Sequence, residues 1–243
     1  MKKGKALSLY KKHHVDNCDE RLGQFLLLTE KFTIKNALYS GSFVHITPSF
    51  VIPNVVYVDT NKQAREFFND ISVYEFVSKK KMYDEDSIIT FHSKDYRKDI
   101  GEPTESFDLL ISQYAGFVSQ HCKKYLKIGG ILLVNNSHGD ASMASIDIDY
   151  KFVGVMNKRQ NKFSFSEKNL ESYFIPKKPR KVTREYLEKI KRGIGYTKSP
   201  TVYVFKKGDK REISGAYSSC PQFKSPRLHH AEQEIVTFVS MKI

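Results

Sequence analysis

The sequence predicts an α/β fold in which helices cover both faces of an open, mostly parallel sheet. Three segments support this prediction: a glycine turn at residues 39–42, an apolar run at 55–58 that an acid follows, and a long apolar run at 126–134. Each of them pairs a strand-like run with a turn or an acid at its end. Open α/β sheets build ligand pockets in this way, along the edge where the parallel strands end.

Length and composition favour one main domain. The chain has 243 residues, of which 40% are hydrophobic, and this is enough to bury the core of a large α/β domain. We expect that domain at residues 19–207, with a flexible basic N-terminal arm at 1–18 and a C-terminal extension at 208–243. The sequence leaves the oligomeric state open.

The chain has no sequence feature of a membrane or secreted protein. No apolar stretch approaches the length of a membrane span, and no basic, then apolar leader follows Met1. We therefore expect a cytoplasmic protein that does not enter a membrane. The three cysteines, Cys18, Cys122 and Cys220, are odd in number and far apart, which argues against a disulfide framework.

Positive charge is concentrated late in the chain. The net charge is +13, and between residues 176 and 212 there are 13 Lys or Arg side chains against four acids. Aromatic residues, which can stack on unpaired bases, interleave with these cations: Tyr186, Tyr196, Tyr203 and Phe205. The segment predicts nucleic acid or another polyanion as a partner. A solvated helix face is the other interpretation.

The first half of the chain predicts alternating helices and strands. Asp19 is a suitable N-cap for the first helix, and Pro48 and Pro53 bracket a connection with no room for a long crossover helix. The periodicity of apolar residues sets the limits of each element. The predicted elements are a helix at 19–32, a strand at 36–39, a strand at 55–58 and a helix at 62–69.

The second half predicts the rest of the sheet. A helix runs to Tyr125, and the pair Gly129-Gly130 is expected to stop it and to start the next strand. An insertion at 157–200 separates the last two strands and contains a basic helix at 183–192. Strands that alternate with helices imply right-handed crossovers between parallel strands. The predicted strands are residues 87–91, 107–112, 126–134, 150–156 and 201–206.

The order and spacing of these motifs resemble a class I S-adenosylmethionine-dependent methyltransferase, over residues 19–207. The resemblance implies a three-layer, Rossmann-like methyltransferase sheet, mostly parallel with an antiparallel last strand. In that family a glycine turn after the first strand lets the backbone approach the cofactor, and an acid that ends the second strand holds the ribose diol. The fourth and fifth strands carry the substrate side.

The resemblance also assigns candidate site residues. It implies S-adenosylmethionine as the cofactor and a methyltransferase activity whose acceptor the sequence does not identify. Tyr114 and His138 are the candidate catalytic, substrate-side groups. The candidate cofactor-binding residues are Tyr39, Ser40, Gly41, Asp59, Asp95 and Ser112.

The chain departs from the family pattern at two places. Tyr39 stands where the family has an acid, and only Gly41 remains of the usual alternating glycines. Residues 112–115 lack the Asp/Asn-Pro-Pro-aromatic signature of enzymes that methylate amino groups of nucleic acids. These departures favour an alternative: a catalytically inactive, methyltransferase-like module that binds nucleic acid through a basic surface.

Other interpretations stay open or are excluded. Asp59 is also explained as a turn residue that ends a strand, and Gly129-Gly130 as an architectural pair. A nicotinamide dehydrogenase would need the absent Gly-x-Gly-x-x-Gly turn. No metal site is expected, because the His13-His14 and His229-His230 pairs lack ligand spacing. Hydrolases and nucleoside triphosphatases are disfavoured because their Gly-x-Ser-x-Gly and phosphate-loop motifs are missing.

Overall fold

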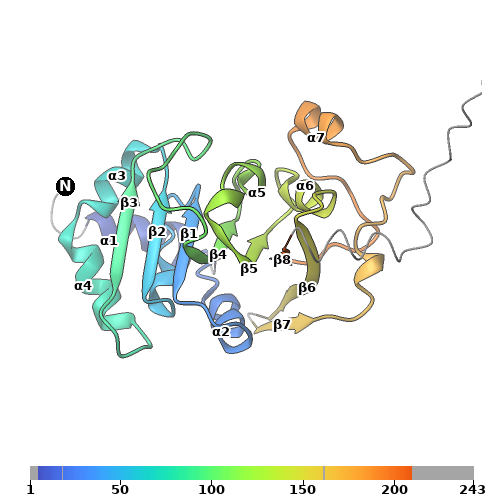
Figure 1. The fold of residues 1–243 in the computed structure, drawn as a ribbon. Coiled ribbons are helices and arrows are strands. Elements are labelled where there is room, and N and C mark those ends of the chain that lie inside the picture. The colour runs from blue at the N-terminus through green and yellow to red at the C-terminus, as the bar shows by residue number, and fades with distance from the viewer. Residues whose placement is uncertain (1–4, 18, 161, 210–243) are drawn as a thin grey trace, which may run out of the picture.

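The structure, a computed structural model, describes residues 5–17, 19–160 and 162–209. Within them, one eight-stranded sheet has the order β3-β2-β1-β4-β5-β8-β6-β7 (Figure 1). Cys18, Cys220, His229, His230 and most of the predicted C-terminal extension lie outside the described residues. The strands are β1 (Asn36–Ser40), β2 (Asn54–Val58), β3 (Ile88–His92), β4 (Phe107–Ser112), β5 (Leu126–Val134), β6 (Tyr150–Arg159), β7 (Lys162–Ser166) and β8 (Val202–Lys207).

The predicted sheet is confirmed. Strands β1 to β5 pair in parallel. The last strand, β8, inserts between β5 and β6 and is antiparallel to both. A further strand, β7, pairs antiparallel with β6 at the edge and was not predicted. The two-face alternation of its short sequence, Lys-Phe-Ser-Phe-Ser, is typical of a half-buried edge strand.

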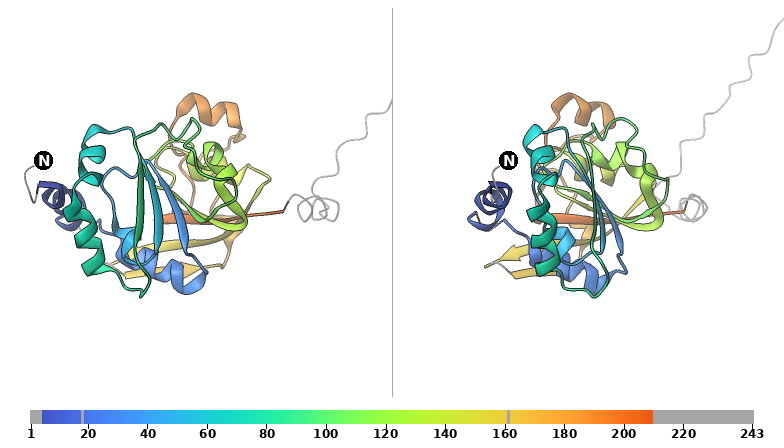
Figure 2. Two further views of the ribbon diagram at one scale, coloured as in Figure 1. Left: turned by 60° about the vertical axis from the view of Figure 1, so that its left-hand side comes forward. Right: turned by 90° about the vertical axis from the view of Figure 1, so that its left-hand side faces the viewer.

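Helices cover both faces, so the molecule has three layers (Figure 2). Along β1, Ala37 and Tyr39 face one core while Leu38 faces the other, as the period of two in a strand requires. Helices α1 to α4 pack on the first core, and α5 and α6 pack on the second. The helices are α1 (Lys5–Tyr10), α2 (Leu22–Lys31), α3 (Lys62–Phe68), α4 (Ile71–Lys80), α5 (Val118–His121), α6 (Asp140–Ser145) and α7 (Arg184–Ile190).

The N-terminal segment is folded in the structure, in contrast to the flexible arm that we expected. Residues 5–15 form α1 and a π-helical turn, η1 (Lys11–Val15). Tyr10 is fully buried, and its hydroxyl contacts Glu20 (2.7 Å) and Thr47 (2.9 Å). The lysines of this segment suggested a loose arm, but tertiary packing of its few apolar side chains orders it.

The first crossover is unusual, as the two prolines predicted. Between β1 and β2 the chain forms only a short 3₁₀ turn, η2 (Thr47–Phe50). The hydroxyl of Tyr10 contacts Thr47 in this turn, so the N-terminal segment packs against this short crossover.

No helix among the described residues is long and apolar enough to cross a membrane.

The prediction for Gly129-Gly130 was wrong. The preceding helical segment, α5 and the 3₁₀ turn η3 (Lys123–Tyr125), ends before Leu126, and both glycines lie inside β5. Gly129 has a φ of +78°, and the register between β4 and β5 shifts next to the pair. The glycines therefore form an irregularity inside the strand, where an added Cβ on Gly130 would lie 2.7 Å from Leu126.

Candidate functional site

The candidate site lies at the carboxyl edge of the sheet, where the strand order reverses. Strand β1 pairs with β2 on one side and with β4 on the other, so the loops after β1 and β4 leave the sheet next to each other. Ligands of open α/β sheets bind in the crevice at such a switch point. Every residue that we predicted for the site ends or follows a strand at this edge.

Because Gly41 has no side chain, the loop that follows β4 can pack closely against it. Gly41 adopts a left-handed conformation, with a φ of +70°. A Cβ at this position would lie 2.7 Å from the Cβ of Ala115. The next residue, Gly116, donates its backbone N–H to the hydroxyl of Tyr96 (3.1 Å), which holds the loop down. Ala115 therefore occupies the space beside the glycine that a ligand would enter.

Asp59 holds the turn after β1. Its Oδ2 accepts a hydrogen bond from the backbone N–H of Phe43 (2.8 Å), and its Oδ1 accepts one from that of Asn61 (2.8 Å). These bonds agree with the interpretation of Asp59 as a turn residue. The side chain is also partly exposed, and an ionised carboxylate has about four acceptor positions, so it retains capacity for further donors.

Tyr39 points into the core. Its hydroxyl lies 3.2 Å from Nδ1 of His45, and Nε2 of His45 lies 3.0 Å from the carbonyl oxygen of Glu20. Because that carbonyl only accepts, Nε2 carries the proton and Tyr39 donates to Nδ1. Burial, followed by the nearby Arg21 guanidinium, holds the pKa of His45 well below its ordinary value. The pair is neutral and buried.

Ser40 and Ser112 also have buried partners. The hydroxyl of Ser40 lies 3.4 Å from the sulfur of Cys122. Ser112 donates its hydroxyl to the carboxylate of Asp140 (2.5 Å), the first residue of α6. Both serine side chains are therefore already hydrogen-bonded inside the protein.

Asp95 lies in the loop after β3 and is paired with a cation. Both of its carboxylate oxygens accept hydrogen bonds from the guanidinium of Arg97. These bonds lower the pKa of Asp95 to about 2. The residue is an ionised acceptor at the edge of the sheet whose nearest donor comes from its own loop.

Tyr114 is exposed in a strained conformation. The residue is 61% exposed, and its φ of +59° lies in the left-handed region, which bulky L residues rarely adopt. Phe43, in the neighbouring loop, has a φ of +49°. Strained residues persist only where the surrounding structure fixes them, and they cluster at functional sites. A fixed, exposed ring at the switch point supports a binding role for Tyr114.

A buried arginine, Arg21, which was not predicted from the sequence, packs against the ring of Tyr114. Arg21 is 8% exposed, and its guanidinium donates to the side chains of Gln113 and of Asp19 (3.0 Å). Its Cζ lies 5.4 Å from the centroid of the Tyr114 ring. Gln113 also donates to Gln24 in α2 (3.0 Å). Gln113 is 92 residues from Arg21 along the chain, so no local pattern marks this cluster.

Hydrogen bonds connect Tyr114 to His138 through the loop after β5. Oδ1 of Asn135 accepts from the backbone N–H of Tyr114 (3.3 Å) and from the hydroxyl of Ser137 (2.8 Å). Nδ1 of His138 lies 3.0 Å from the same hydroxyl. Since the hydroxyl donates to Asn135, Nδ1 of His138 must be the donor to Ser137. This assignment from the hydrogen-bond network leaves Nε2 of the exposed imidazole as a proton acceptor.

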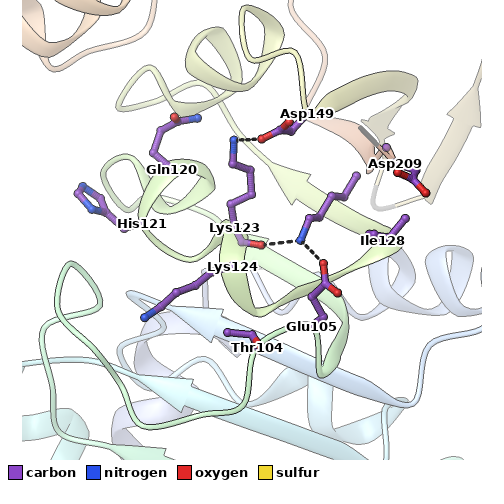
Figure 3. A pocket seen from close by; sticks show the side chains of 11 residues that line it. Thr104, Glu105, Gln120, His121, Lys123, Lys124, Ile128, Asp149 and Asp209 are labelled. Atoms are coloured by element: carbon purple, nitrogen blue, oxygen red, sulfur yellow. Dashed lines mark hydrogen bonds and ion pairs between the residues drawn. The ribbon is translucent and has the colours of Figure 1, made fainter. Parts of the chain in front are cut away.

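A cavity of about 630 Å³ lies at the opposite, amino edge of the sheet (Figure 3). None of the predicted site residues lines it. The three lysines in its lining are ion-paired: Lys123 with Asp147 and Asp149, Lys124 with Asp99, and Lys207 with Glu105. Its size suits a small ligand, but its ammonium groups are already neutralised.

The basic segment predicted at 176–212 does not form one surface. Residues 177–198 lie beside the loop after β5, because Asn136 donates to the carbonyl of Ile194 (3.2 Å) and Gly193 donates to that of Ser137 (3.3 Å). Lys207, in contrast, lies at the amino edge. Residues 210–212 are outside the described residues.

No protein-family model matches the sequence, and no curated protein matches it either. Solved structures that resemble the chain include the O-methyltransferase TomG from Streptomyces achromogenes in complex with SAM (13% identity, 68% of this chain and 88% of that chain, TM-score 0.43). A putative O-methyltransferase from Klebsiella pneumoniae is 11% identical, and the match covers 60% of this chain and 76% of that chain with a TM-score of 0.43. YcgJ from Bacillus subtilis is 17% identical, and the match covers 51% of this chain and 54% of that chain with a TM-score of 0.38. The match therefore spans about half of that protein.

Proposed function

We propose that this protein is an S-adenosylmethionine-dependent methyltransferase. The observation that carries the proposal is strand β8, which lies antiparallel between β5 and β6. The resemblance implied this arrangement, whereas the dinucleotide-binding Rossmann sheet continues with a parallel sixth strand. The glycine turn after β1 and the acid after β2 lie at the same sheet edge and support the proposal further.

The residues at the turn fit the ribose end of the cofactor. Asp59 has acceptor positions left for two vicinal hydroxyls, and its two backbone bonds fix its orientation. The hydroxyl of Ser42, in the turn after β1, is buried and has no hydrogen-bond partner among the described residues. Buried polar groups without partners are rare, and a polar ligand group is one explanation. At Gly41, binding of the methionine end requires Ala115 to withdraw.

The remaining site residues act on the acceptor. S-adenosylmethionine supplies a methyl group on a sulfonium, so the protein chiefly has to align the acceptor and, where the acceptor carries a proton, to remove it. The exposed ring of Tyr114 provides a flat surface for a planar acceptor. Nε2 of His138 accepts the proton, because Nδ1 is committed to Ser137.

The catalytically inactive, nucleic-acid-binding module is the second candidate function. Two observations favour it. Ala115 fills the space beside Gly41 that the cofactor would enter, and a buried tyrosine, Tyr39, stands where the family has an acid. A measurement of S-adenosylmethionine binding distinguishes the two candidate functions. A methyltransferase binds S-adenosylmethionine, whereas the inactive module binds only the polyanion.

Replacing Asp59 with alanine is expected to weaken S-adenosylmethionine binding by about 1.5–3 kcal/mol, since hydrogen bonds to a charged group are lost. Calorimetric titration of wild type and Asp59→Ala gives the two affinities. Circular dichroism establishes whether the variant as a whole remains folded.

Asp86→Ala is the matched control, because Asp86 is an exposed acid next to the amino end of β3. Its affinity for the cofactor should equal that of wild type. If Asp59→Ala is folded and binds the cofactor as tightly as wild type does, Asp59 is only a turn residue.

A further inference from the structure

We propose that the substrate of this protein is a single-stranded nucleic acid, whose phosphates bind a basic collar on the insertion and whose base stacks on Tyr114. Its role as methyl acceptor rests on the proposed function, while the binding surface does not. The basic collar is defined by nine exposed side chains: Lys177, Lys178, Arg180, Lys181, Arg184, Lys189, Lys191, Arg192 and Lys198.

The charges of the basic collar are not compensated. Only two acids, Glu185 and Glu188, occur among residues 177–198. Within residues 5–17, 19–160 and 162–209, none of the nine cations takes part in an ion pair. Four lysines at the amino edge, Lys123, Lys124, Lys127 and Lys207, are in contrast each paired with an acid. Unpaired cations on one surface attract a polyanion, and phosphate contacts supply most of non-specific nucleic-acid affinity.

The basic collar is fixed to the sheet. Leu187, Ile194 and Tyr196 form a small core with Met143 of α6. The hydroxyl of Tyr196 donates to Ser142 (2.8 Å). In Figure 1, α7 accordingly lies next to α6. The cations are therefore held on a folded support beside the candidate site.

A short series of hydrogen bonds joins the basic collar to Tyr114. Gly193, next to Arg192, donates to the carbonyl of Ser137 (3.3 Å), and the hydroxyl of Ser137 donates to Asn135 (2.8 Å). Asn135 also accepts from the backbone of Tyr114 (3.3 Å). A strand whose phosphates contact the collar thus lies within reach of the exposed ring.

A single strand fits better than a duplex. The bases of a single strand are free to stack on an aromatic ring such as Tyr114, whereas those of a duplex are paired and stacked inside. Tyr196, Tyr203 and Phe205, which the sequence analysis also considered for stacking, are buried and unavailable. Of the aromatic residues considered in the basic segment, only Tyr186 is partly exposed, and Arg180 lies over its ring.

The electrostatic half of the proposal is tested by salt dependence. Single-stranded DNA and RNA of about 20 nucleotides are titrated by fluorescence anisotropy between about 50 and 300 mM salt. Lys189→Ala with Lys191→Ala is expected to make the slope of log K against log salt shallower by about 1.4, at about 0.7 per phosphate contact. The matched control, Lys79→Ala with Lys80→Ala, removes two charges from the end of α4 and should leave the slope unchanged.

The stacking half is tested at Tyr114. Tyr114→Leu is expected to weaken single-strand binding about tenfold, and Tyr114→Phe to retain it, because stacking needs the ring and not the hydroxyl. Both replacements keep a Cβ in the left-handed conformation, so backbone strain is matched. Equal affinity of the Leu and Phe variants overturns the stacking role.

Three further results of these binding measurements would each contradict a specific claim. No binding at about 50 mM salt, where the electrostatic contribution is strong, overturns the whole proposal. Preference for a duplex, or equal binding of inorganic polyphosphate, overturns the single-strand assignment. Strand binding without any S-adenosylmethionine binding leaves the surface in place and rejects the methyltransferase function.

Discussion

Replacing Gly193 with alanine is expected to lower the free energy of unfolding by about 3 kcal/mol, at the upper end of the usual overpacking range. An added Cβ would lie 1.9 Å from the carbonyl oxygen of Asn136, a backbone atom that cannot rotate away. The insertion must then separate from the loop after β5. Urea denaturation gives the stability, and the same variant should lose nucleic-acid affinity while it still binds S-adenosylmethionine.

Gly195 provides the control in the same loop. A Cβ on Gly195 would lie 3.8 Å from its nearest neighbour, the Cδ of Lys177, which is ordinary contact. Gly195→Ala should therefore match wild type in stability and in nucleic-acid binding. Equal stability of both variants would mean that the contact between Gly193 and Asn136 does not hold the insertion in place.

The stability of the protein is expected to depend on pH through Asp140. Burial raises the pKa of this carboxyl to about 6, although it accepts hydrogen bonds from Ser112 and Ser119. Its ordinary value is 3.8, so the folded protein holds the proton more tightly than the unfolded chain does. The stabilisation is fully present below about pH 4 and is lost as the pH rises through about 6.

The size of this effect is about 3 kcal/mol, from a shift of about two units at 1.36 kcal/mol each. Asp140→Asn removes the titrating group but retains one acceptor oxygen. Between pH 4 and pH 7 wild type should therefore lose most of this amount, about 2.5 kcal/mol, relative to this variant. Urea denaturation of both proteins across that range measures the difference, and parallel pH profiles would contradict the assigned burial effect.

The central strands were predictable because their signal is local. β2 and β4 are rich in apolar residues, and their limits match the predicted ones within a residue. β8 was also predicted within a residue, and its antiparallel direction followed from the resemblance. β7 was missed because five residues of alternating character are too short to distinguish from a loop. The N-terminal helix was missed because Tyr10 is stabilised by tertiary contacts with Glu20 and Thr47.

The site was predictable only in outline. The glycine turn and Asp59 were found because both occur at fixed places relative to strands. Arg21, which contacts Gln113 and Tyr114, gives no such signal, since Gln113 lies 92 residues further along the chain. The contact of Ala115 with Gly41 likewise joins residues that are brought together only when β1 and β4 pair.

Calorimetric titration of the full chain with S-adenosylmethionine tests the central claim most directly. The proposed methyltransferase function predicts saturable binding at one site per chain. No binding heat at millimolar cofactor would contradict that function. The protein would then be a methyltransferase-like module whose glycine turn is closed by Ala115.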